Sequence, residues 1–128
     1  MKIDTRRIER IFEAAEKDGR PFLLEPQVYE VLRLAGIAAP RFIFLPAGTK
    51  AARKDLAALG TDAVVVKIVS PLIIHKSDVG GVEFVKADAP SVNRACRRML
   101  RTAPLRYLQW QRNTGQAGSG KPPGLRAV

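Results

Sequence analysis

The sequence predicts an α/β fold. Segments with the apolar spacing of helices alternate with runs of β-branched residues, and glycine or proline stands at most of the boundaries between them. The chain has 128 residues, of which 46% are hydrophobic. Because a domain of fewer than about 150 residues usually has a single core, one modest globular domain is expected.

Two helices are predicted at the N-terminus. Apolar residues at helical spacing indicate a helix over about residues 5–18, with Asp4 as its N-cap and Gly19 as its end. Pro26 suits the first turn of a second helix, which Gly36 ends. Both helices therefore have their own start and stop signals.

Strands and a third helix are predicted in the middle of the chain. A short strand follows Pro40 and covers residues 41–45, and a helix follows over about residues 49–59. The β-branched run at residues 63–69 predicts an interior strand, and the chain returns as a strand over residues 82–85. A polar loop joins these last two strands.

A fourth helix is predicted next, with Ser91 as a candidate cap. Five apolar residues share the spacing of one helix face: Val92, Ala95, Cys96, Met99 and Leu100. Cys96 is the single cysteine and cannot form an internal disulfide. Its place on the apolar face favours a core residue over a reactive thiol.

Basic residues are concentrated near the C-terminus. Residues 1–88 carry 14 basic and 12 acidic side chains, whereas residues 89–128 carry 8 basic and no acidic ones. From Thr102 onward the apolar periodicity is lost and the sequence becomes rich in glycine, proline and serine. We therefore expect an ordered domain over residues 1–101 and a basic tail over residues 102–128 that is either disordered or a non-native, unrelated ending.

The arginines of the fourth helix allow two interpretations. Arg94, Arg97, Arg98 and Arg101 lie at helical spacing opposite the apolar face. A basic stripe can bind nucleic acid, but a solvated helix face explains the same pattern and is favoured.

The strand over residues 63–69 carries a lysine and leads into a loop closed by two glycines. Because an unpaired buried charge is strongly unfavourable, Lys67 must turn its ammonium toward an anion or water. The loop then supplies His75, and it ends at Gly80 and Gly81, where backbone N–H groups can approach an anion closely. This order of residues indicates a phosphate-binding loop.

Two segments resemble a known family. The run from Val64 to Val82 is similar to the nucleotide-binding loop V-V-L-K-x-V-S-P-x-I-x-H-K-S-D-V-G-G-V of the ATP-grasp domain in NDP-forming acyl-CoA synthetases. Residues 24–40 resemble the family's opening helix and its G-I-x-x-P exit. The resemblance covers about residues 22–100 and departs at Leu72, where the family often has an acidic residue. It implies the N-terminal subdomain of an ATP-grasp fold.

The resemblance also implies roles for individual residues. Lys67 would contact the α- and β-phosphates of the nucleotide, where its point charge neutralises them; the alternative is a solvated lysine of an edge strand. Gly80 and Gly81 would contact phosphate, but they would serve a plain hairpin turn equally well.

His75 is the only histidine, and the resemblance implies that it accepts a phosphoryl group. The alternative is a solvent-facing imidazole that is hydrogen-bonded to Asp78 or to the backbone. Lys76 and Ser77 could donate to phosphate oxygens and Asp78 could orient His75, although solvated loop polarity explains these three residues as well.

The family couples an acyl-CoA thioester, ADP and phosphate to acid, CoA and ATP, reversibly. The implied cofactors are ATP or ADP and Mg²⁺, with the metal ligands outside this chain, and the implied partner is a CoA-binding subunit or domain. Since the family's second half of the nucleotide site has no match after residue 100, the chain alone is expected to be truncated and inactive.

Other classes of protein are less compatible with the sequence. No apolar run reaches the roughly 18 residues that span a bilayer, and no signal-peptide pattern is found, so a cytoplasmic location without a membrane partner is expected. The alternative function is a non-catalytic basic nucleic-acid-binding protein. The lack of an aromatic RNA-recognition motif disfavours it.

Overall fold

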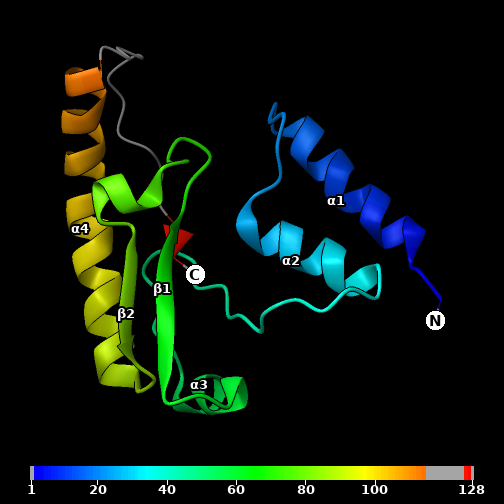
Figure 1. Ribbon diagram of the computed structural model, residues 1–128, viewed down its shortest axis with the longest axis horizontal. Helices are drawn as coiled ribbons and strands as arrows, with labels where there is room; N and C mark the ends of the chain where they lie inside the picture. The colour runs from blue at the N-terminus through cyan, green and yellow to red at the C-terminus, as the bar shows by residue number, and fades with distance from the viewer. Residues whose placement is uncertain (1, 115–125, 128) are drawn as a thin grey trace. The chain divides into compact units, whose positions relative to one another are not determined.

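The computed structural model describes residues 2–114 and 126–127 (Figure 1). Its contacts divide the chain into two compact units, Met1–Phe42 and Ile43–Val128. The α/β prediction is confirmed by the alternation of helices and strands along the chain.

The first unit contains helices α1 (Thr5–Lys17) and α2 (Glu25–Leu34). The predicted cap of α1 is confirmed, because the Asp4 carboxylate accepts a hydrogen bond of 3.1 Å from the backbone N–H of Arg7. In α2 the Gln27 side chain accepts from the N–H of Leu24 at 2.9 Å. Both helices therefore begin with a satisfied backbone donor.

Two departures from the prediction are found between residues 41 and 59. Residues 41–45 form no strand, and only Leu45 makes an isolated bridge. An extended segment becomes a strand only where a neighbour completes its ladder, and none of the described residues does so here. Helix α3 covers Arg53–Leu59 and begins later than expected, because Thr49 closes a turn onto the carbonyl of Pro46 instead.

A three-stranded sheet follows, in the order β2-β1-β3. Strand β1 (Ala63–Val69) pairs in antiparallel register with β2 (Val82–Lys86), and its last residues pair with β3 (Arg126–Ala127). The predicted strands are confirmed, and the loop between them contains a short 3₁₀ helix, η1 (Lys76–Val79). Helix α4 (Ala89–Thr114) runs alongside β1 and β2 (Figure 1).

The core of the second unit lies between α4 and one face of the sheet. It includes the apolar face that the sequence predicted for the fourth helix, with Cys96 buried among its neighbours. Burial raises the pKa of the Cys96 thiol, which agrees with a packing role. The largest fully buried side chains are Ile68, Met99 and Val79.

The predicted start of the tail at residue 102 is wrong, because helix α4 extends beyond it. It continues through Pro104 to Thr114, so residues 102–114 are helical. A proline inside a helix costs about 3 kcal/mol because a backbone hydrogen bond is lost. Burial of Ala103 and Tyr107 and the packing of Trp110 against the core offset this cost. Most of the remaining expected tail lies outside the described residues, although two of its residues form β3.

The cap of α4 also differs from the prediction. The Asp88 carboxylate accepts a hydrogen bond of 2.8 Å from the N–H of Ser91, so Asp88 and not Ser91 supplies the capping side chain. This bond lowers the pKa of Asp88.

Candidate functional site

Lys67 lies on the sheet face that points away from α4. Its neighbours Val66 and Ile68 are buried in the core, and side chains alternate along a strand, so Lys67 is directed to the opposite face. The register pairs Lys67 with Val82 and Val65 with Phe84, and residues paired in this way share a face.

This outer face of the sheet is defined by Val65, Lys67, Val82 and Phe84. It is largely apolar and accessible, since Phe84 is 79% exposed and Val65 is 39% exposed. Lys67 itself is half-buried. The sheet thus carries one lysine on an accessible apolar face, which is a suitable arrangement for a flat ligand that carries negative charge.

The loop that follows β1 is fixed to the core on both sides of its polar residues. Ile73 and Val79 are buried, and the buried hydroxyl of Ser70 accepts a hydrogen bond of 3.2 Å from the N–H of Leu72. Between these anchors Lys76 is half-buried, whereas the predicted donor Ser77 is exposed. The loop therefore presents its polar segment from a rigid base.

Gly80 and Gly81 both have structural reasons to be glycine. Gly80 has a φ of 68°, a conformation that disfavours a side chain. At Gly81 a Cβ would lie 2.5 Å from Cγ2 of Ile68. Their N–H groups are donated within the loop, to the carbonyls of Ser77 at 3.3 Å and Lys76 at 2.7 Å. In this conformation both N–H groups are hydrogen-bonded inside the loop, as in a structural turn, and do not point toward a ligand.

An arginine that the sequence reasoning missed lies over Gly80. A Cβ at Gly80 would be 2.3 Å from Nη1 of Arg106, so the guanidinium covers this glycine. Nearby, Arg98 forms an ion pair with Glu83 and lowers the pKa of that carboxyl group. These groups border a cavity of about 230 Å³ between β2 and α4. Arg106 belongs to the segment expected to be disordered, and its position could not be foreseen.

His75 is exposed and lies beside an aromatic ring of α4. The centroids of the His75 and Trp110 rings are 6.0 Å apart, with an angle of 43° between their planes. A cavity of about 210 Å³ adjoins this contact, and its lining includes Ile73, Val79 and Tyr107. The carbonyl of His75 accepts a hydrogen bond of 3.2 Å from the N–H of Asp78, which belongs to the backbone of the 3₁₀ turn and does not involve the imidazole. The expectation that apolar periodicity is lost from Thr102 onward was wrong, because Ala103, Tyr107 and Trp110 keep helical spacing across Pro104, and this spacing could have found Trp110.

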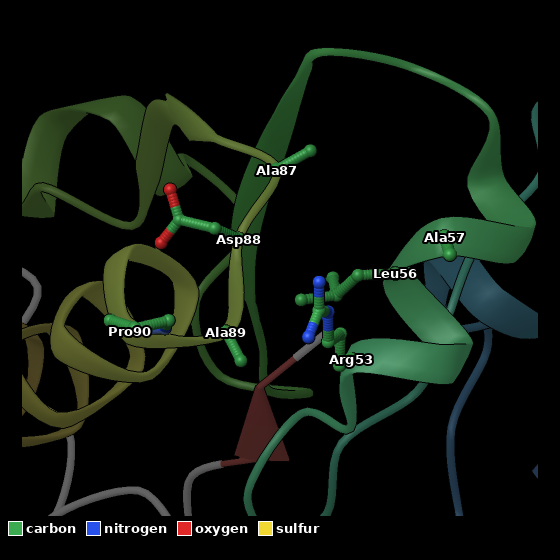
Figure 2. Close-up of a pocket in the computed structure, with 7 residues that line it drawn as sticks. All are labelled: Arg53, Leu56, Ala57, Ala87, Asp88, Ala89 and Pro90. Atoms are coloured by element: carbon green, nitrogen blue, oxygen red, sulfur yellow. The ribbon is translucent and has the colours of Figure 1, made fainter.

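A larger cavity of about 510 Å³ lies between α3 and the start of α4 (Figure 2). Its charged lining residues are Arg53 and Asp88, and Figure 2 shows that the Asp88 carboxylate turns away from Arg53. None of the residues predicted to bind phosphate lines this cavity.

Within residues 2–114 and 126–127, no three side chains of histidine, cysteine, aspartate or glutamate gather as a metal site would require. Over the same residues, none of the helices combines the length and the apolar character of a membrane span.

Comparisons with known proteins match residues 14–111 to the ATP-grasp domain family. The chain is 39% identical over 98 residues to the acetate–CoA ligase (ADP-forming) I subunit beta of Pyrococcus furiosus, covering 73% of this chain and 39% of that protein. It is 35% identical over 106 residues to the 4-hydroxybutyrate–CoA ligase (ADP-forming) of Nitrosopumilus maritimus, covering 80% of this chain and 14% of that protein.

The fold is also similar to that of a solved structure. ACD1 of Ca. Korarchaeum cryptofilum in complex with coenzyme A is similar with a TM-score of 0.59 and 27% identity, covering 77% of this chain and 43% of that chain. The chain thus spans less than half the length of each of these proteins. Both relatives named above are ADP-forming CoA ligases. Because the family match covers most of the chain, this chain belongs to the ATP-grasp domain family.

Proposed function

We propose that this chain forms the N-terminal part of the nucleotide site of an NDP-forming acyl-CoA synthetase. The reaction converts acyl-CoA, ADP and phosphate to acid, CoA and ATP, and it is reversible. The observation that supports this proposal best is the register of Lys67, whose side chain is directed to the accessible apolar face of the sheet just before the His75 loop.

The outer face of the sheet suits a nucleotide. Val65 and Phe84 offer apolar surface on which an adenine ring can lie, and Lys67 offers the charge that neutralises phosphates. When bound, ADP supplies the terminal phosphate oxygen that receives a phosphoryl group. Lys67 would hold those phosphates, and the exposed hydroxyl of Ser77 would add a donor. Gly80 and Gly81 would keep this part of the loop compact against the phosphates.

His75 is proposed as the phosphoryl acceptor. An imidazole nitrogen would use its lone pair to form the N–P bond, and that bond would break when the phosphoryl group leaves for the nucleotide. The exposed position of His75 between two anchored loop segments supports this role, because the ring must be reached by its reaction partner. Mg²⁺ ligands and a CoA-binding subunit or domain would be contributed outside the described residues.

Substitution of Lys67 tests the nucleotide site. Lys67→Met keeps the apolar stem but removes the charge, so ADP binding by this chain should weaken by about 1.5–3 kcal/mol, the value of a charged hydrogen bond. Thermal unfolding should change little, because methionine suits the site and no charge is left to desolvate. Calorimetry with ADP, alongside thermal unfolding, gives both measurements.

The control is Lys54→Met, which removes the same charge from an exposed position on α3. It should leave ADP binding unchanged. If Lys67→Met binds ADP as tightly as the parent chain but unfolds at lower temperature, Lys67 is a structural residue and the proposed site is wrong.

A further inference from the structure

An aromatic pair on α4 lies next to the loop that carries His75. Trp110 is within the distance at which aromatic rings attract one another, with its centroid 6.0 Å from that of His75. Trp110 in turn stacks on Tyr107, with centroids 6.1 Å apart and an angle of 21° between the rings. The imidazole therefore contacts the outer member of a stacked pair.

The stacked pair is fixed to the core. Tyr107 is buried, and its hydroxyl accepts a hydrogen bond of 2.9 Å from the Gln111 side chain one turn further along α4. The loop opposite is fixed as well, because Ile73 and Val79 are buried on either side of His75 and line the same cavity. Both partners of the His75–Trp110 contact thus stand on rigid elements.

We propose that Trp110 is a positioning residue for His75: the indole restricts the imidazole to one orientation and so determines which ring nitrogen faces an incoming phosphoryl group. This inference rests on the proposed role of His75 as phosphoryl acceptor. An exposed histidine otherwise samples several rotamers, and phosphoryl transfer requires the nitrogen lone pair to be directed at phosphorus. Trp110 acts through His75 and is not itself assigned a contact with substrate.

The contact can be tested directly, because the chain has one tryptophan and one histidine. An imidazole beside an indole alters the surroundings of the indole, and tryptophan emission depends on those surroundings. At neutral pH the emission spectrum of Trp110 should therefore differ between the parent chain and His75→Ala. Identical spectra for the two proteins would overturn the proposal.

The positioning itself is tested by chemical phosphorylation of His75 with phosphoramidate. In this reaction an imidazole nitrogen forms the new N–P bond while the P–N bond of phosphoramidate breaks and ammonia leaves. Phosphorus NMR distinguishes the two ring isomers of phosphohistidine. The ratio of the two isomers in the parent chain and in Trp110→Phe should differ from the ratio in a short histidine peptide by about two- to tenfold. This is the range that the interaction energy of an aromatic pair supports.

Trp110→Ala should give the isomer ratio of the peptide. Leu105→Ala, which removes an exposed side chain of the same helix, is the matched control and should behave as the parent chain. A ratio in the parent chain equal to that of the peptide, or equal ratios in the parent chain and Trp110→Ala, would overturn the proposal. Neither experiment uses nucleotide or acyl-CoA, so a failure here is distinct from a failure of ADP binding.

Discussion

At Gly81 the absence of a side chain is a packing requirement. The Cβ of any other residue would lie 2.5 Å from Cγ2 of Ile68 and 3.0 Å from the carbonyl oxygen of Lys76. Ile68 is fully buried, and the Lys76 carbonyl already accepts the Gly81 N–H, so neither neighbour can move without disturbing the core or the loop.

Gly81→Ala should therefore destabilise the fold by about 1–3 kcal/mol, the usual cost of overpacking a core. Urea unfolding measures this loss. Gly48→Ala separates packing from backbone strain, because Gly48 has open space around it but a φ of 85°; its cost should be about 1 kcal/mol. A Gly81→Ala chain as stable as the parent would show that the loop is looser than its contacts indicate.

At the scale of elements, the first turn of α4 depends on one carboxylate. The hydrogen bond from the Ser91 backbone is the main cause that lowers the pKa of Asp88 from its usual value of 3.8. A carboxylate with a lowered pKa in the folded state stabilises that state above its unfolded pKa. This stabilisation is lost as the pH falls through the folded pKa.

We expect Asp88→Asn to reduce the loss of stability between neutral pH and pH 3, because asparagine still caps the helix but does not titrate. The measurement is the thermal midpoint as a function of pH for both proteins. Asp55→Asn is a suitable control, since Asp55 is exposed on α3. Parallel pH profiles for the parent and Asp88→Asn would contradict the capping role.

The elements that the sequence predicted best are those whose signal is local. The β-branched run of β1 and the cap of α1 are such cases. Ser91 and Asp88 are both good capping residues. Which of them caps α4 depends on where β2 ends, and the end of β2 is set by tertiary contacts. The strand expected at residues 41–45 failed for a related reason, because it needed a partner.

Helix α4 shows most clearly what local sequence signals cannot predict. Pro104 is a local stop signal, and the burial of Tyr107 that overrides it depends on a core built from distant strands. The contact between His75 and Trp110 depends on this continuation of the helix. Part of the candidate site was therefore hidden from any reasoning that ended the helix near residue 101.

At the scale of the whole molecule, the two units differ in how much they bury. The buried core cluster belongs to residues 43–128, whereas in residues 2–42 only Ala15 and Leu34 are buried hydrophobic residues. Segments of about 40 residues rarely hold a stable core without additional support. Local opening of the first unit should consequently cost less free energy than opening of the second.

Amide hydrogen exchange of the chain tests this difference. Amides of β1 and of α4 near Met99 should exchange at least about tenfold more slowly than those of α1 and α2, since exchange from a well-packed core requires opening of most of the unit. The caps of α1 and α2 do not alter this expectation, because a satisfied end does not supply buried apolar area. Equal protection of the two units would mean that the first unit gains its stability from contacts beyond its own buried residues, and the chain would then unfold as one cooperative body.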